Sequence, residues 1–220
     1  MLSGARVLIT LGPTEAPIDA VRRIVNTSSG ATGCAIAEAV LAAGAEVVVL
    51  RGPGSRSPQP HRRLRGVPVR TVPDLLEVAG HELAAARFHA VVHAMAVLDY
   101  VPDAAASAKV ESGQDEWLLR LVPTPKVIDR IRTWAPDALL IGFKLVVNET
   151  PQGMVEAALK LLMRSGADVV IANDLSLMDG DRHEALFVER DGAVSAQAHD
   201  ERAIADEVVR RIAAWRADRA

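Results

Sequence analysis

The segment from residue 7 to residue 33 restricts the possible folds more than any other part of this 220-residue chain. Its apolar start, 7–10, predicts a buried strand that ends at a Gly-Pro turn. A long polar loop follows, and Gly30-Ala-Thr-Gly33 then opens an alanine-rich helix predicted over 31–43. A strand that leads through a Gly/Ser-rich loop into a helix directs backbone N–H groups and the positive end of the helix dipole at one point. The segment therefore predicts an anion site in an α/β domain.

Strand and helix patterns alternate along the rest of the chain. Short apolar runs predict further strands at 46–50, 67–71 (an edge strand), 90–93, 138–143 and 168–172. Helical patterns occupy 74–87, 125–133, 150–165 and 199–216, while 51–68 is irregular and 186–196 predicts a terminal hairpin. This order is typical of a doubly wound, mostly parallel, Rossmann-like sheet. We expect one domain over 1–220, interrupted by a flexible flap or hairpin at about 103–118.

Charge and composition exclude several classes of partner. The 25 basic and 28 acidic residues are interspersed and leave a net charge of −3, which argues against a surface that coats nucleic acid. No apolar run approaches the roughly 18–20 residues that a membrane span needs. The single cysteine, Cys34, cannot form an intramolecular disulfide, and this fits a reducing compartment. We therefore expect a cytoplasmic protein that binds neither nucleic acid nor membrane.

Polar residues follow several of the predicted strands where each one ends. The loops 11–33, 94–102, 143–148 and 173–176 all leave carboxyl ends, which meet at one edge of such a sheet. A dinucleotide fingerprint is not present, because nineteen residues (11 through 29) separate the first strand from Gly30 and Arg51 stands where a ribose-binding acid is needed. An NADP-dependent reductase remains an alternative, since Arg51 can meet a 2′-phosphate, but Tyr100 has no lysine four residues later.

Five ordered motifs carry a specific resemblance. They are PIDAVRRIVNTSSGATG (17–33), HAMAVLDYVP (93–102), Lys109 followed by LVPTPKVI (121–128), GFKLVVN (142–148) and ADVVIANDLS (167–176). Together they resemble phosphopantothenate–cysteine ligase, in its stand-alone form without the fused decarboxylase. The resemblance implies that 4′-phosphopantothenate is joined to L-cysteine through an acyl-nucleotide, with release of pyrophosphate, in coenzyme A biosynthesis. It also implies CTP or ATP with Mg²⁺, no flavin, and a homodimer in which the flap of one subunit lies near the site of the other.

The resemblance assigns roles to individual residues. Asn26 and Lys109 match the catalytic residues, Asn26 holding the acyl-nucleotide and Lys109 acting from the flap on the triphosphate. The substrate-binding positions are Gly12, Thr14, Arg22, Ser28, Ser29, Gly30 and Ala96. The nucleotide-binding positions are Asp99, Lys109, Pro125, Lys126, Val127, Ile128, Phe143, Lys160 and Arg164. The metal ligands are not assigned.

The remaining candidate residues give weaker support for a catalytic role. Lys109 stands alone where relatives carry several flap lysines, so a catalytically lapsed protein that senses nucleotide or phosphopantothenate is a further alternative. Cys34 is interpreted as a small buried hydrophobe. The six histidines show no metal-ligand spacing, and His93, which ends a predicted strand, is interpreted as structural.

Overall fold

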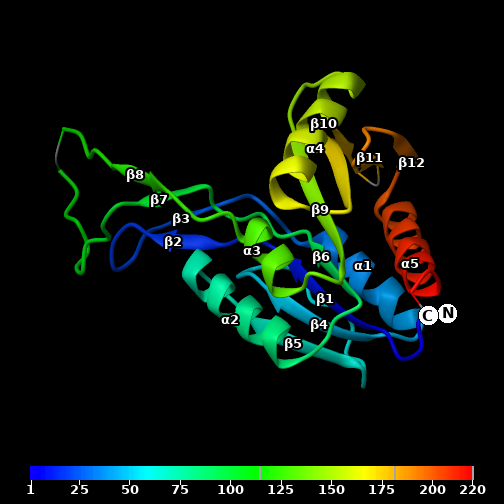
Figure 1. Ribbon diagram of the computed structural model, residues 1–220. Coiled ribbons are helices and arrows are strands. Elements are labelled where there is room, and N and C mark those ends of the chain that lie inside the picture. The colour runs from blue at the N-terminus through cyan, green and yellow to red at the C-terminus, as the bar shows by residue number, and fades with distance from the viewer. Residues whose placement is uncertain (114, 181, 220) are drawn as a thin grey trace.

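The computed structural model in Figure 1 describes residues 1–113, 115–180 and 182–219. Its centre is an eight-stranded sheet in the order β12-β11-β10-β9-β6-β1-β4-β5. The parallel strands are β1 (Arg6–Leu11), β4 (Glu46–Arg51), β5 (Leu64–Pro68), β6 (Ala90–His93), β9 (Leu139–Val146) and β10 (Val169–Asp179). The antiparallel strands β11 (Arg182–Glu189) and β12 (Val194–Ala198) complete one edge. The expected doubly wound, mostly parallel sheet is confirmed.

Helices cover both faces of this sheet (Figure 1). One face carries α1 (Ala31–Ala42) and α5 (Glu201–Ala217), and the other carries α2 (Val72–Ala85), α3 (Val127–Trp134) and α4 (Pro151–Ser165). Along β1, Val7 and Ile9 belong to the apolar core under α1 and α5, whereas Leu8 belongs to the core under α2, α3 and α4. Because both faces are covered, the strand is apolar throughout rather than alternating.

Local chemistry sets the helix starts. Thr71 and Asp74 form a capping box at α2, so this helix begins at Val72, two residues before the predicted start. At α4 the Thr150 hydroxyl accepts a hydrogen bond from the N–H of Gly153 at 3.1 Å. None of the helices among the described residues is both long enough and apolar enough to span a membrane.

The structure differs from the sequence-based prediction at one edge strand and in the loop after β1. The edge strand β5 lies at Leu64–Pro68 rather than at 67–71, because it pairs with β4 from Val47 onward and leaves Thr71 to cap α2. In addition, the long polar loop after β1 contains an unpredicted hairpin of β2 (Glu15–Pro17) and β3 (Arg23–Val25). Strands of three residues are too short to produce a periodic sequence signal.

Two small hairpins project together from the sheet. The β2–β3 hairpin lies beside a second one formed by β7 (Tyr100–Pro102) and β8 (Leu121–Pro123), and we call residues 15–25 and 100–123 the arm. Figure 1 shows the arm extending away from the helices. The segment expected to be a flap, 103–118, is the outer part of this arm, although residue 114 lies outside the described residues.

A buried carboxylate joins the two hairpins of the arm. Asp19 accepts hydrogen bonds from the N–H groups of Val21, Arg22 and Val110, and the Arg22 guanidinium lies 2.8 Å from its Oδ2. Burial alone would raise the pKa of Asp19, but these N–H groups and the arginine together hold it below its ordinary value. Trp117 lies under the same guanidinium, with its ring centre 5.0 Å away.

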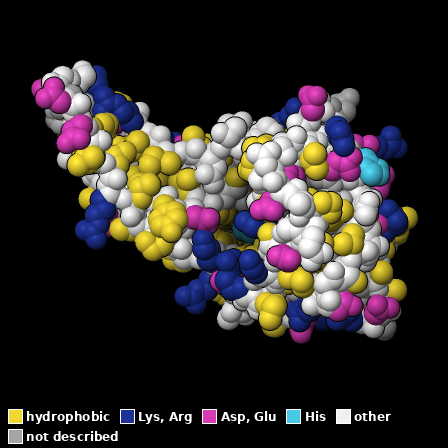
Figure 2. All heavy atoms as spheres, turned by 90° about the horizontal axis from the view of Figure 1, so that it is seen from above, with side chains coloured by type: hydrophobic (Ala, Val, Ile, Leu, Met, Phe, Trp, Pro, Cys, Tyr) yellow, Lys and Arg dark blue, Asp and Glu magenta, His cyan; other side chains and the backbone are white. Residues whose placement is uncertain are grey.

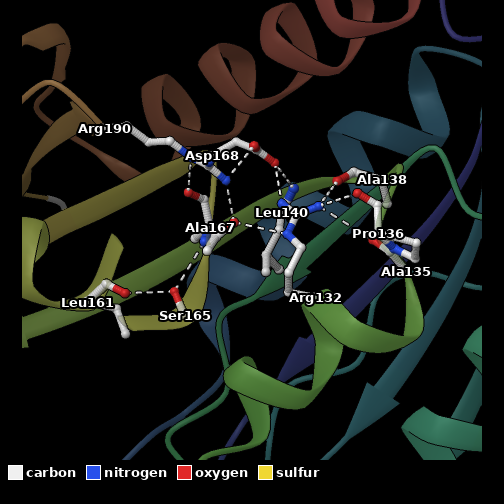
Figure 3. Close-up of polar contacts among 11 residues, drawn as sticks. Arg132, Ala135, Pro136, Ala138, Leu140, Leu161, Ser165, Ala167, Asp168 and Arg190 are labelled. Carbon is white, nitrogen blue, oxygen red and sulfur yellow. Dashed lines mark hydrogen bonds and ion pairs between the residues drawn. The ribbon is translucent and has the colours of Figure 1, made fainter. Parts of the chain in front are cut away.

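A second polar cluster holds the opposite end of the sheet (Figure 3). Asp168 receives the N–H of Leu140 at 2.8 Å and the guanidinium of Arg132 at 2.6 Å, and Arg190 approaches its other oxygen at 3.2 Å. Arg132 also donates to the carbonyl oxygen of Gly166 at 2.9 Å. The cluster therefore fastens α3 and the β11–β12 turn to the starts of β9 and β10.

We predict that Asp168→Ala lowers the free energy of unfolding by about 2 kcal/mol, because it leaves the half-buried Arg132 guanidinium and the N–H of Leu140 without this acceptor, while Arg190 is exposed and contributes little. Urea denaturation of the variant and the parent chain measures the change. Asp137→Ala is the matched control, since Asp137 is exposed, and its effect should stay within about 0.5 kcal/mol. Equal effects of the two substitutions would show that the cluster is not stabilising.

Candidate functional site

A cavity of about 1280 Å³ opens at the carboxyl ends of β6, β9 and β10 and at the start of α1. Its walls come from segments that are distant in sequence and converge only in the folded chain. Those that carry predicted site residues are 26–33, 93–99, 125–128, 143–146 and 153–164. The expected meeting of the strand-end loops is therefore confirmed.

The start of α1 forms one end of this cavity. The helix is capped by Gly30 in the left-handed conformation (φ 69°), and no side chain accepts a hydrogen bond as its cap. Ser29 Oγ receives the N–H of Ala31, while the N–H groups of Thr32 and Gly33 have no acceptor among the described residues. Free N–H groups at a helix N-terminus attract an anion. We call residues 28–33 the cradle.

Close packing fixes the position of the cradle. A Cβ atom on Gly33 would lie 2.5 Å from Cβ of Leu11, so any side chain there would push α1 away from β1. The absence of a side chain lets the first turn of α1 lie directly against the end of β1.

Asn26 lies beside the cradle and is tied to the loop that follows β6. Its Nδ2 donates to the carbonyl oxygens of Ala96 and Val97, at 3.3 and 3.1 Å. Its Oδ1 has no protein partner among the described residues and remains available to a ligand in the cavity that Asn26 lines. The amide is therefore held in one orientation before any ligand binds.

His93 forms part of the cavity wall at the end of β6. It is 8% exposed, and its Nδ1 shares a hydrogen bond of 2.8 Å with Oγ1 of Thr10 on the neighbouring strand. Burial lowers the pKa of His93 to about 4, so its ring is uncharged at neutral pH. The described residues offer no partner to its Nε2.

The predicted nucleotide-binding residues all line the cavity, apart from Lys109. Lys126, which precedes α3, pairs with Asp99 at 2.5 Å, and no side chain accepts the first N–H groups of that helix. Arg164 on α4 pairs with Asp129 on α3 at 3.2 Å. Of the cations that line the cavity, Lys144 and Lys160 have no carboxylate partner within the described part of the chain.

The structure places Asn173, which the sequence already put at this edge of the sheet, beside His183 and Glu201, two cavity residues that the sequence did not indicate. Asn173 Nδ2 lies 3.1 Å from Nε2 of His183, whose Nδ1 lies 3.5 Å from Oγ1 of Thr32, and Thr32 reaches Glu201. Burial lowers the pKa of His183, against the opposing charge of Glu201. These residues meet because β10 continues beyond Ala172 and pairs again with β11, which the sequence pattern did not show.

Asp174 holds the loop between β9 and α4 in place next to the cavity. Its carboxylate is fully buried and accepts the hydroxyl of Ser176 at 2.6 Å and the N–H groups of Asn148 and Glu149. The Ser176 hydroxyl and these backbone donors lower the pKa of Asp174 to about 2.

Four of the predicted site residues lie outside the cavity wall. Thr14 is buried and accepts the N–H of Leu98 at 2.9 Å, and Gly12 packs against Ser55. Arg22 and Lys109 are both on the arm, where Arg22 is bound to Asp19 and Lys109 is exposed. Gly12 and Thr14 therefore support the loops of the site, while the two cations of the arm are not brought to the cavity of their own chain.

We predict that His93 makes the protein less stable in mild acid. Its pKa in the folded chain is about 4, below the ordinary 6.5, so the unfolded chain takes up the proton first. The stability that comes from keeping His93 uncharged is complete above pH 6.5 and is lost as the pH falls toward 4. The free energy of unfolding should therefore fall by about 2 kcal/mol between pH 7.5 and pH 5.0. Urea denaturation at the two pH values measures this fall, which should be smaller by that amount in His93→Asn than in the parent chain. Parallel losses in the two proteins would contradict the assignment.

Comparison with known proteins gives a consistent result. Residues 2–215 match the family described as the DNA/pantothenate metabolism flavoprotein C-terminal domain. The chain is 38% identical over 205 residues to the coenzyme A biosynthesis bifunctional protein CoaBC of Thermococcus kodakarensis, covering 93% of this chain and 50% of that protein. It is 32% identical over 174 residues to the CoaBC of Bacillus subtilis, covering 79% and 41%. The chain thus spans about half the length of the curated relatives it matches.

A solved structure has the same architecture. The DNA/pantothenate metabolism flavoprotein from Streptococcus pneumoniae superposes with a TM-score of 0.89 at 32% sequence identity, covering 96% of this chain and 100% of that one. The central sheet and its helices are therefore common to both proteins.

Proposed function

The chain belongs to the family of DNA/pantothenate metabolism flavoprotein C-terminal domains, and we propose that it is a phosphopantothenate–cysteine ligase. The reaction joins 4′-phosphopantothenate to L-cysteine in coenzyme A biosynthesis, at the expense of CTP or ATP. The name of the Thermococcus kodakarensis relative, which the chain matches over 93% of its own length, supports this assignment. The observation that carries it is the cavity in which Asn26 and the cradle lie beside the loop after β6.

The proposed reaction has two steps. The carboxylate of 4′-phosphopantothenate attacks the α-phosphorus of the nucleotide, and pyrophosphate leaves. The cysteine amine then attacks the acyl carbon, the nucleoside monophosphate leaves with the electron pair, and the amine loses a proton. The first step needs donors near the phosphoryl oxygens, and the N–H groups of Thr32 and Gly33 are available for this role. The amide of Asn26, already fixed by its bonds to the β6 loop, holds the acyl-nucleotide between the steps.

The nucleotide extends from the cradle toward α3 in this proposal. The N-terminus of α3 and the ring of Phe143 border the far side of the cavity and receive the base, while Asp99 faces the ribose. Lys160 and Lys144 supply charge to the phosphates, because Arg164 is already neutralised by Asp129. Lys126 pairs with Oδ1 of Asp99, so Oδ2 is the oxygen that accepts the ribose hydroxyl in this proposal.

Mg²⁺ enters this proposal together with the nucleotide. The described residues contain no group of three or more His, Cys, Asp or Glu side chains placed to hold a metal ion. We propose that the triphosphate oxygens and water supply most of the Mg²⁺ ligands, as Mg²⁺ commonly requires in nucleotide sites. The ion would neutralise charge on the leaving pyrophosphate.

The reductase alternative rested on the Gly30-x-x-Gly33 helix start and on Arg51, and the position of Arg51 argues against it. The Arg51 guanidinium donates to the carbonyl oxygen of Ser55 at 3.2 Å, and Arg51 does not line the cavity. We also propose a cytoplasmic location, in keeping with the free, buried thiol of Cys34.

The proposed function is tested by release of pyrophosphate from purified protein with 4′-phosphopantothenate and Mg²⁺. CTP, ATP, GTP and UTP are supplied in parallel, each with and without L-cysteine. We expect release with one nucleotide and an increase when cysteine is added, because cysteine clears the acyl-nucleotide. Asn26→Asp should slow the cysteine-dependent step by at least about tenfold while leaving part of the first step intact. Folded protein that binds nucleotide without releasing pyrophosphate would favour the lapsed sensor instead.

We propose further that the protein is a homodimer in which each arm completes the partner's site. Large apolar side chains cluster on the arm (Figure 2) and are exposed there. They are Val21, Val25, Tyr100, Trp117, Leu118, Leu119 and Leu121, with Leu118 82% exposed. An exposed apolar surface of this kind marks a protein interface. Pairing of two chains through this surface would also bring Arg22 and Lys109, which lie away from the cavity of their own chain, to the cavity of the second copy.

Mixed dimers test this arrangement. Lys109→Ala and Asn26→Ala should each reduce turnover by at least about a hundredfold alone, since each removes a group of the reaction centre. In a purified heterodimer of the two variants, one cavity has both Asn26 and the partner's Lys109, so about half of the parent activity should return. A stable heterodimer without recovered activity would place Lys109 with the cavity of its own chain.

A further inference from the structure

His93 occupies the point where the direction of chain winding reverses. From β1 the chain continues to β4 and β5 on one side, whereas β6 lies on the other side of β1. Thr10 and His93 are paired residues at the carboxyl ends of these two central strands. Ligands of doubly wound sheets bind at this crossover.

One ring nitrogen of His93, Nε2, is open to the cavity. Nδ1 is engaged by the Thr10 hydroxyl, and the residue lines the cavity with 8% of its surface exposed. Nε2 of His93 has no protein partner among the described residues. It is nevertheless not fully buried, because Arg63 Nε is the one fully buried side-chain nitrogen or oxygen atom without a partner in the described part of the chain. Since His93 lines the cavity, the exposed Nε2 is open to it. A ring held at Nδ1 and open at Nε2 is oriented for a ligand.

The place of His93 defines which part of a nucleotide lies nearest to it. The cradle at the start of α1 lies on one side of the β6 end, and the N-terminus of α3 with Phe143 lies on the other. A nucleotide with its phosphates at the cradle and its base at α3 must cross the end of β6. The segment that crosses joins the ribose to the α-phosphate, where the proposed first step occurs.

We propose that His93 is a nucleotide-contacting residue whose ring donates or accepts a hydrogen bond, through Nε2, at the ribose–α-phosphate segment. This inference rests on the proposed function. The Thr10 hydroxyl can donate to Nδ1 or accept from it, so Nε2 can carry the proton or a lone pair as the ligand requires. An uncharged ring makes this contact without adding to the charge that Lys144 and Lys160 supply.

Two substitutions separate the two ring nitrogens. In His93→Asn the amide replaces Nδ1 and can keep the bond to Thr10, but nothing replaces Nε2. In His93→Gln the longer side chain carries its amide to the place of Nε2. Calorimetry with the α,β-methylene analogues of CTP and ATP measures nucleotide binding without turnover. Calorimetry with 4′-phosphopantothenate alone serves as the control ligand.

We expect His93→Asn to weaken binding of the preferred analogue about tenfold, the loss of one good hydrogen bond, and His93→Gln to restore most of it. Binding of 4′-phosphopantothenate should change less than twofold in both variants. Thr10→Val, which removes the Nδ1 partner and leaves Nε2 in place, should weaken nucleotide binding less than His93→Asn does.

The possible results distinguish this inference from the proposed function. If the parent chain binds neither analogue, the proposed function fails and the inference fails with it. If the parent chain binds one analogue and His93→Asn binds it equally well, the inference alone is overturned. If His93→Asn weakens nucleotide and 4′-phosphopantothenate to the same extent, His93 is a structural residue and the contact is refuted.

Discussion

The contact between Gly33 and Leu11 is the constraint on which the site depends. Helix α1 lies against the end of β1 only because Gly33 has no side chain, and a Cβ there would come within 2.5 Å of Cβ of Leu11. This contact places the free N–H groups of the first helical turn at the edge of the sheet. A helix shifted outward by a side chain would still form, since its apolar face is local, but its N-terminus would no longer point into the cavity.

Hydrogen bonds between loops then make the cavity wall rigid. Asn26 bonds to the backbone after β6, Thr14 accepts the N–H of Leu98, and the Thr124 hydroxyl donates to the Leu98 carbonyl at 2.6 Å. Three loops that are distant in sequence are thereby fixed to one another before a ligand arrives. Such preorganisation reduces the ordering that binding would otherwise require. The Asp168 cluster ties α3 and the β11–β12 turn to the other end of the strands, and Asp168, Arg132 and Arg190 do not line the cavity.

The arm separates two kinds of site residue. Residues that lie on the strand ends or on the helices α3 and α4 share one cavity, whereas Arg22 and Lys109 are carried away from it by the two hairpins. Their separation follows from the contacts of Asp19 with Arg22 and with the N–H of Val110, which join the two hairpins to each other. The exposed apolar side chains nearby give the arm a surface suited to a second copy of the chain.

The sequence by itself determined the central sheet, its helices and the convergence of polar loops at one edge, because strand and helix periodicity and the caps at Thr71 and Thr150 are local properties. It also indicated most of the cavity residues, since they lie at predicted strand ends. Only the tertiary structure decided the β2–β3 hairpin, the pairing of Arg164 with Asp129, and the meeting of Asn173 with His183. It likewise directed the free nitrogen of His93 into the cavity. These features depend on register and on contacts between segments far apart in the chain, which no local pattern encodes.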